Sequence, residues 1–143
     1  MLKTNYQYIV GIDPGVNTGL CVYLTEKKHF EIITCKIHEA MMELLRLQSN
    51  GYIIAYFEDA RKRKWFGNTG REVLQGIGSV KRDCKIWEDF LTDEKIFFVA
   101  RAPAKGKTKW SKEYFDKVMA TLGWKGQSSE HARDATCLIL GLI

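Results

Sequence analysis

The stretch Tyr8-Ile9-Val10-Gly11-Ile12-Asp13-Pro14-Gly15 joins a short apolar run to an acid and a turn. An apolar run of this length is typical of a buried strand. Pro14 and Gly15 take the chain sharply out of the strand, so we expect the Asp13 carboxylate at the strand end, at the edge of the core. An acid in that position can reach both solvent and a metal ion. Considered alone, Asp13 could equally be a turn-forming residue.

Two further acidic segments follow, each beside another apolar run. The run 52–57 ends at Glu58, which we expect at the end of a second strand. His131 and Asp134 lie three residues apart at the start of a last apolar run, 135–143, so they share one face of a helix's first turns. Three acids and a histidine that converge can bind divalent metal ions, and two such ions can hold the attacking and leaving oxygens of a phosphodiester. The candidate catalytic and metal-ligating residues are therefore Asp13, Glu58, His131 and Asp134.

The three segments occur in a fixed order: Gly11-Ile12-Asp13-Pro14-Gly15 followed by Asn17-Thr18-Gly19, then Glu58, then His131-x-x-Asp134-Ala135. In this order they resemble the RuvC family of Holliday-junction resolvases, within the ribonuclease-H-like superfamily. The resemblance spans nearly the whole chain. It implies a nuclease that uses Mg²⁺ or Mn²⁺, as two ions, and that cuts branched DNA such as four-way junctions. It also implies a two-fold homodimer.

The order of apolar runs and turns predicts one α/β domain over residues 1–143, with a ribonuclease-H-like five-stranded mixed sheet flanked by helices. Turn signals make the first three strands an antiparallel meander. The fourth strand returns through a helix, which places it beside the first strand and parallel to it, so Asp13 and Glu58 should meet at one sheet edge. We expect strands at about 7–13, 18–25, 29–36, 52–57 and 95–100, and helices at about 37–49, 70–92, 111–122 and 129–142.

Positive charge is concentrated in the second part of the chain. The formal net charge is +5, and residues 58–143 carry all of the excess. Two basic stretches, Arg61–Lys64 and Arg101–Lys112, flank the candidate metal site. Such stretches are often only solvated faces, but phosphate backbone would suit both the basic residues and the acidic metal site.

Two aromatic residues, Trp65 and Phe66, directly follow the first basic stretch. They could stack on bases at a branch point or anchor the loop in the core. The candidate nucleic-acid-binding residues are Arg61, Lys62, Arg63, Lys64, Trp65, Phe66, Lys105, Lys107, Lys109 and Lys112.

Helix 70–92 carries an apolar seam with alternating spacings of four and three residues, formed by Val73, Ile77, Val80, Cys84, Trp87 and Leu91. Such a seam fits a core-facing helix or a dimer interface. Gly76 and Gly78 in mid-helix each cost roughly 0.8–1 kcal/mol relative to Ala unless another surface packs closely there. This favours a homodimer through helix 70–92.

The sequence leaves the roles of His131 and Asp59 open. His131 could be a neutral metal ligand, a proton donor to the leaving oxygen or a residue that merely starts a helix. Asp59 directly follows Glu58, and the alternation of side chains along a strand predicts that it points away from the site.

Other classes of protein fit the sequence less well. Four cysteines without Cys-x-x-Cys spacing indicate reduced thiols rather than a zinc site. No apolar run is long enough to span a membrane and no signal-peptide core is present, so we expect a cytoplasmic protein without a membrane partner. The alternatives are an RNA- or hybrid-processing nuclease of the same superfamily, a non-catalytic junction-binding protein, and an ATPase that would need a second domain.

Overall fold

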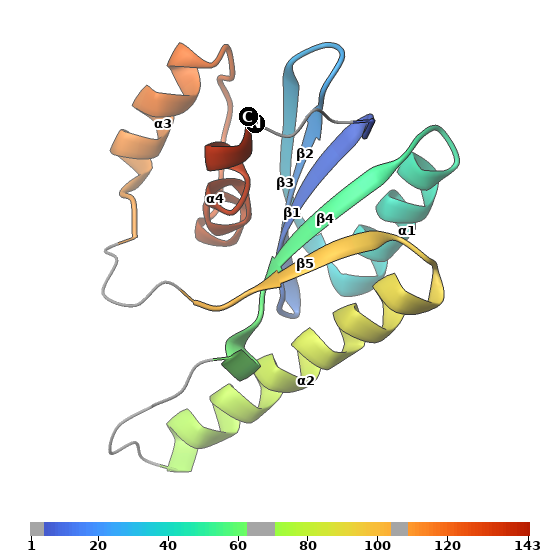
Figure 1. The fold of residues 1–143 in the computed structure, drawn as a ribbon. Helices are drawn as coiled ribbons and strands as arrows, with labels where there is room; N and C mark the ends of the chain where they lie inside the picture. The colour runs from blue at the N-terminus through green and yellow to red at the C-terminus, as the bar shows by residue number, and fades with distance from the viewer. Residues whose placement is uncertain (1–4, 63–70, 104–108) are drawn as a thin grey trace.

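The computed structural model describes residues 5–62, 71–103 and 109–143, and only the backbone of residues 71–74 (Figure 1). Its elements in chain order are β1 (Tyr8–Asp13), β2 (Asn17–Leu24), β3 (His29–Lys36), α1 (Ile37–Gln48), β4 (Ile53–Glu58), the 3₁₀ turn η1 (Ala60–Lys62), α2 (Arg71–Asp93), β5 (Phe97–Arg101), α3 (Lys112–Thr121), α4 (Glu130–Cys137) and the 3₁₀ turn η2 (Leu140–Leu142).

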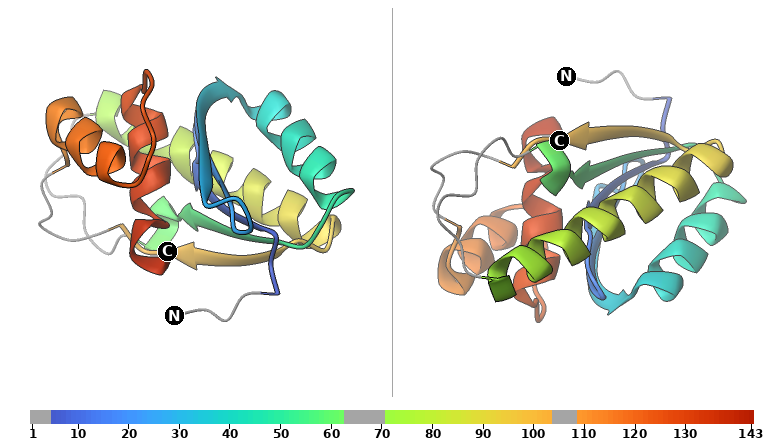
Figure 2. Two further views of the ribbon diagram at one scale, coloured as in Figure 1. Left: turned by 90° about the horizontal axis from the view of Figure 1, so that it is seen from above. Right: turned by 90° about the horizontal axis from the view of Figure 1, so that it is seen from below.

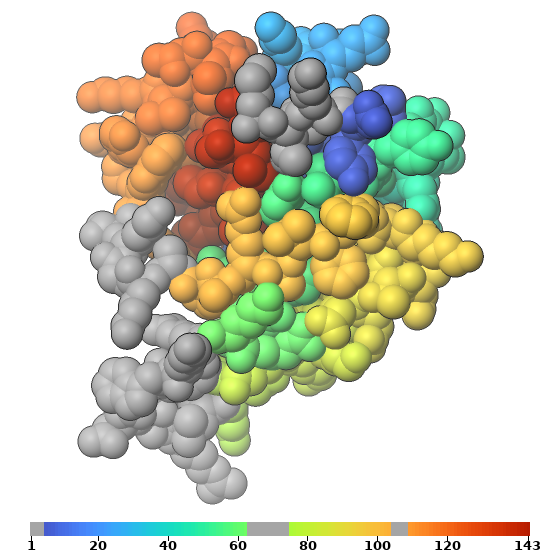
Figure 3. Space-filling model, in the orientation of Figure 1, coloured from blue at the N-terminus to red at the C-terminus, as the bar shows by residue number. Residues whose placement is uncertain are grey.

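These strands form the predicted five-stranded mixed sheet, in the order β3-β2-β1-β4-β5. β1, β2 and β3 pair antiparallel, whereas β4 pairs parallel with both β1 and β5. The crossover through α1 is what returns the chain to the side of β1. β5 is an edge strand, and it crosses the face of the molecule seen in Figure 3.

Helices cover both faces of the sheet, so most residues of the central strands β1, β2 and β4 are buried (Figures 1 and 2). α1 and α2 cover one face. α4 lies directly on the other face, and α3 packs outside it. Alternate residues of each strand therefore enter two different cores. The first core includes Ile12, Leu20, Phe57, Leu44 and Trp87, and the second includes Ile9, Cys21, Tyr56, Phe115 and Ala135.

The end of the last helix differs from the prediction of 129–142. α4 ends at Cys137, and a 3₁₀ turn follows. The Leu138 carbonyl accepts a hydrogen bond from Arg101 Nη1 at 3.0 Å, and the amide of Leu142 donates to Ile139 O instead. A side chain from β5 thus takes the acceptor that another α-helical turn would use. The other predicted elements lie within two residues of the observed bounds.

The apolar seam of α2 is buried in the second half of the helix and partly exposed in the first half. Cys84, Trp87 and Leu91 are buried in the core. Val80 is 39% exposed, and a Cβ built on Gly76 or Gly78 would meet no atom of the described residues within 4 Å. The core-facing interpretation is therefore right for the second half of the helix. It does not account for the first half, where the side chain of Val73 lies outside the described residues.

None of the helices in the described parts of the chain is long and apolar enough to cross a membrane. The cysteines at 21, 35, 84 and 137 are all free thiols, as expected.

Candidate active site

The register between β1 and β4 brings two of the predicted acids together. Gly11 pairs with Tyr56 and Ile12 with Phe57, so Asp13 and Glu58, one residue further along, lie side by side at the same sheet edge. Glu58 is the last residue of β4 rather than the residue after it. Because alternate residues share a face, both acids lie on the face that α4 covers.

Two glycines let α4 approach the sheet closely. A Cβ on Gly11 would lie 2.1 Å from the carbonyl oxygen of Ala135, and one on Gly19 would lie 1.9 Å from the carbonyl oxygen of His131. Both distances are too short for any side chain, so helix and strand backbones contact each other directly. The first turn of α4 is thereby held over the ends of β1 and β2. The side chain of Ser129 caps this turn by accepting from the amide of Ala132 at 3.1 Å.

His131 contacts Asp13 across this interface. Nδ1 of the histidine lies 2.9 Å from Oδ2 of the carboxylate. With Nδ1 engaged in this hydrogen bond, Nε2 is the nitrogen through which the ring could bind a metal or pass a proton. The contact disfavours the interpretation that His131 only starts a helix.

The electrostatic environment of Asp13 reflects the neighbouring acids. Burial raises the pKa of Asp13 to about 6, and the negative charges of Asp134 and Glu58 act in the same direction. The hydrogen bond with His131 opposes this increase in the pKa. Asp134 and Glu58 are therefore close enough to Asp13 to destabilise its ionised form.

Asp134 is engaged by a lysine from the second basic stretch. Lys109 Nζ lies 2.9 Å from Asp134 Oδ2 and 3.2 Å from Glu130 Oε1. The ion pair with Asp134 holds the pKa of Lys109 above its usual range. Lys109 thus carries positive charge directly into the acidic site.

The donor atoms suit a hard divalent cation. Among the described residues, no three His, Cys, Asp or Glu side chains are grouped so that they could hold a metal ion in their present conformations. Nevertheless, the three carboxylates are the oxygen ligands that Mg²⁺ and Mn²⁺ prefer, and imidazole is a common ligand of transition metals. A cation would also offset the burial, and the smaller repulsion by Asp134 and Glu58, that raise the pKa of Asp13. The residues present therefore fit a metal site, provided that His131 and Lys109 yield their hydrogen-bonded positions.

We expect Asp13→Asn to stabilise the metal-free protein at pH 7 and to lose this advantage on acidification. The pKa of Asp13 is about 6 in the folded protein, against 3.8 for an unperturbed group. The folded state therefore binds the proton more tightly than the unfolded state, and the wild type loses stability as the pH rises from about 4 to about 6. The difference between the two pKa values gives Asp13→Asn an advantage in stability of up to about 3 kcal/mol over the wild type at pH 7.

Urea unfolding of both proteins with a chelator, at pH 4 and pH 7, measures this effect. Added Mg²⁺ should stabilise the wild type more than the variant. A stability difference that does not change with pH would contradict the prediction.

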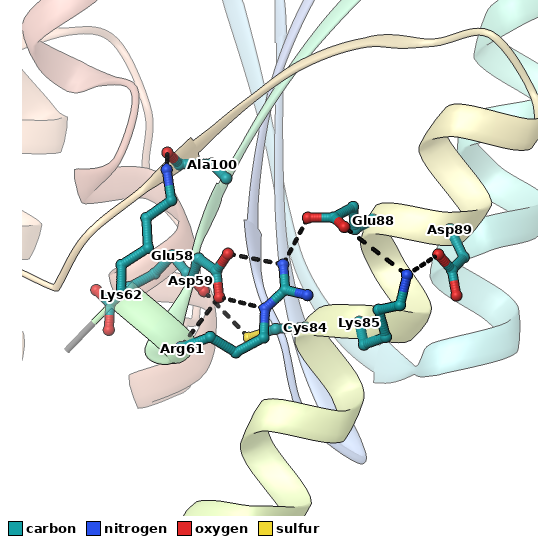
Figure 4. A network of polar contacts seen from close by, with 9 residues as sticks. All are labelled: Glu58, Asp59, Arg61, Lys62, Cys84, Lys85, Glu88, Asp89 and Ala100. Atoms are coloured by element: carbon teal, nitrogen blue, oxygen red, sulfur yellow. Dashed lines mark hydrogen bonds and ion pairs between the residues drawn. The ribbon is translucent and has the colours of Figure 1, made fainter. Parts of the chain in front are cut away.

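Asp59 faces away from the site, as the alternation of side chains predicted. It is 2% exposed, and its two carboxylate oxygens accept hydrogen bonds from Arg61 Nε and Nη2, each at 2.8 Å. These hydrogen bonds hold the pKa of Asp59 below its usual range. Arg61 also reaches Glu88 of α2 at 2.6 Å, so the pair ties the end of β4 to that helix (Figure 4).

Arg61→Met should therefore lower stability, because it leaves the buried Asp59 carboxylate without its cation. We expect a loss of about 2–3 kcal/mol in the free energy of unfolding, since Arg61 itself is partly exposed. The matched control is Arg46→Met, whose guanidinium is mostly exposed and pairs with Glu43 of the same helix; it should change stability by about 0.5 kcal/mol or less. Unchanged stability of Arg61→Met with weakened DNA binding would instead make Arg61 a phosphate contact.

The structure gives several of the predicted nucleic-acid-binding residues a protein partner. Lys62 Nζ donates to the carbonyl of Ala100 at 2.8 Å, and Lys112 pairs with Asp116 at 2.7 Å. Arg61 and Lys109 are paired as described above. The remaining candidates, Arg63, Lys64, Trp65, Phe66, Lys105 and Lys107, lie outside the described residues.

Sequence reasoning missed the packing role of Gly11 and Gly19 and the use of Arg101 inside the protein. Glycine inside a strand is a known signal of close backbone approach, and both glycines carried it. Arg101 was counted in a basic stretch, but it bonds the end of α4 and its guanidinium lies 4.8 Å from the centre of the Tyr56 ring. Nothing local in the sequence indicates that contact.

Comparison with solved structures supports the fold. Similar to this chain is T. thermophilus RuvC in complex with a Holliday junction substrate, with a TM-score of 0.53 and 19% identity, over 92% of this chain and 89% of the other. The resemblance to RuvC seen in the sequence is thus confirmed at the level of the fold. No family model matches the chain, and no curated protein matches it by sequence.

Proposed function

We propose that this protein is a metal-dependent endonuclease that hydrolyses phosphodiester bonds in branched DNA, with four-way junctions as its main substrate. The observation that carries the proposal is the meeting of Asp13 and Glu58 at one sheet edge with the α4 turn that bears His131 and Asp134. The RuvC-like fold supports it, because the similar protein was solved with a Holliday junction. A role in DNA recombination or repair would follow.

Each candidate residue has a task that its location suits. Asp13, Glu58 and Asp134 would hold Mg²⁺ or Mn²⁺, as two ions, which lower the pKa of the attacking water and neutralise charge on the phosphate. Asp13 and Glu58 extend from paired strands, so the sheet sets their spacing. His131 could complete the ligand set through Nε2 or give a proton to the leaving oxygen.

The basic residues would bind the phosphate backbone on either side of this site. This assignment includes Lys62, Arg63, Lys64, Lys105, Lys107 and Lys112. Arg61 is left out because it forms an ion pair with Asp59. Trp65 and Phe66 would stack on bases that are unpaired at the branch point.

The deciding experiment is a cleavage assay on a panel of substrates with Mg²⁺, Mn²⁺ or a chelator. The panel contains a four-way junction, a flap, linear duplex DNA, duplex RNA and an RNA–DNA hybrid. We expect the junction to be cut fastest, with 5′-phosphate ends, and only with metal. Cutting of RNA or hybrid alone would replace the proposed substrate. Tight junction binding without cutting in either metal would make the protein a non-catalytic binder.

We also propose a homodimer that forms through the first half of α2. Val80 is exposed there, and the described residues leave space beside Gly76 and Gly78 in which another helix could approach. Gly76→Leu should fill that space and weaken dimerisation at least about tenfold, whereas Gly76→Ala, the size control, should have a smaller effect. Sedimentation of both variants and the wild type measures this. A wild type that stays monomeric at high micromolar concentration, even on DNA, would contradict the dimer.

A further inference from the structure

Lys109 is where the described part of the second basic stretch meets the acidic site. Its ammonium lies between two carboxylates on one face of α4, those of Glu130 and Asp134, which are four residues apart. Lys109 is 65% exposed, whereas the paired Asp134 is only 25% exposed. The lysine therefore lies on the solvent side of a more sheltered carboxylate, where an incoming cation or phosphate would meet it.

We propose that Lys109 is a displaceable counter-ion of Asp134. It neutralises this acid while no metal is bound, and it moves to a DNA phosphate once a divalent ion takes the carboxylate. The inference rests on the proposed function, because it takes Asp134 to be a metal ligand. It adds a role for Lys109 that links metal binding to DNA binding.

Competition for Asp134 Oδ2 is the physical basis. This oxygen already accepts a charged hydrogen bond from Lys109 at 2.9 Å. A Mg²⁺ ion binds a carboxylate oxygen at about 2.0–2.1 Å, so an ammonium left at the same oxygen would lie close to a doubly charged ion and be repelled. The long, flexible lysine stem allows the ammonium to leave without moving the backbone.

Glu130 explains why the released lysine would remain nearby. Its carboxylate is a second acceptor for Lys109, at 3.2 Å, and is not among the candidate metal ligands. A lysine released from Asp134 could keep this contact or turn towards a phosphate that has reached the metal site. The ammonium of Lys109 that leaves Asp134 can then pair with a negatively charged phosphate of the substrate.

A purely structural ion pair is the competing explanation. It would serve to hold the segment before α3 against α4. α3 has another anchor that does not involve Lys109: its Phe115 and Met119 are fully buried in the same core as Ala135 of α4. Loss of Lys109 should therefore leave α3 in place.

Metal binding by the DNA-free protein is the first test. We expect Lys109→Gln to bind Mn²⁺ about fivefold more tightly than the wild type, the largest effect usual for an exposed ion pair. Isothermal titration calorimetry with MnCl₂ measures this directly. The control is Lys117→Gln, which removes the same charge from an exposed position of α3 and should leave the affinity unchanged.

The salt dependence of DNA binding is the second test, on a four-way junction with phosphorothioate linkages that slow cutting. With Mn²⁺, Lys109→Gln should flatten the slope of log affinity against log salt by about 0.9, the value for one lost phosphate contact. With a chelator, the slope should not change, because Lys109 then remains on Asp134. Circular dichroism of the variant checks that its helix content is retained.

The outcomes separate this inference from the proposed function. Tighter Mn²⁺ binding together with a metal-dependent change in slope supports the exchange. If the wild type binds Mn²⁺ but Lys109→Gln binds it no more tightly, the exchange is wrong and the proposed nuclease stands. Equal gains in Lys109→Gln and Lys117→Gln, or equal slope changes with and without metal, also overturn it. A wild type that binds no Mn²⁺ overturns both proposals.

Discussion

Asp13→Asn is expected to reduce cleavage of a four-way junction by at least about a thousandfold while leaving the protein folded and able to bind DNA. The amide keeps the shape of the side chain but loses the charge that holds a cation. Metal ions contribute several kcal/mol of charge stabilisation to such reactions, and about 4 kcal/mol corresponds to a thousandfold change in rate. Single-turnover cleavage with Mg²⁺, together with junction binding in a chelator, measures both quantities.

Substitutions at the other three candidate residues provide the comparison. Glu58→Gln and Asp134→Asn should lose cleavage to a similar degree, whereas His131→Ala should lose less, because a neutral ligand contributes less to holding a cation. Glu31→Gln, at an exposed position of β3, is the control and should cut normally. Full activity in any two of the three acid variants would overturn the site.

Gly19→Ala should be among the most damaging single changes outside the acids. Its new Cβ would lie 1.9 Å from the His131 carbonyl oxygen and 2.8 Å from the Ala132 amide nitrogen. These are backbone atoms of α4, so no side chain can rotate away to make room. We expect a loss of at least about 3 kcal/mol in the free energy of unfolding, which lowers Tm by about 10 °C in a domain of this size.

The damage to catalysis should exceed what the lost stability explains. α4 must move away from β2 to admit the methyl group, and this movement separates His131 and Asp134 from Asp13 and Glu58. Cleavage measured well below Tm, where the variant is folded, should still fall by at least about tenfold. Gly141→Ala is the control, because a Cβ there meets nothing within 4 Å in the described parts of the chain; its Tm and activity should stay near those of the wild type. A normal Tm for Gly19→Ala would contradict the close contact.

Much of the fold was predictable, because its signals are local. The apolar run that ends at Asp13 and the one that ends at Glu58 are both short enough to specify strands, and the helical run between them forces a parallel return. Once these two strands are neighbours, their ends must share an edge. The positions of Asp13 and Glu58 at these two strand ends were therefore enough to predict that they would meet. The start of the last helix, expected at about residue 129 and observed at Glu130, follows from an equally local pattern.

Contacts between distant residues decided the rest. The sequence alone predicted the neighbours of the first four strands and the acids of the candidate site, since hydrophobic spacing and turn residues act over a few positions. Only the tertiary structure showed that Arg101 donates to the Leu138 carbonyl just after α4, that Arg61 reaches Glu88, and that Lys109 lies on Asp134. A charged side chain takes whichever partner the fold brings within about 3 Å. Its neighbours in the sequence do not reveal that partner, so basic residues that look alike in the chain have different roles in the folded protein.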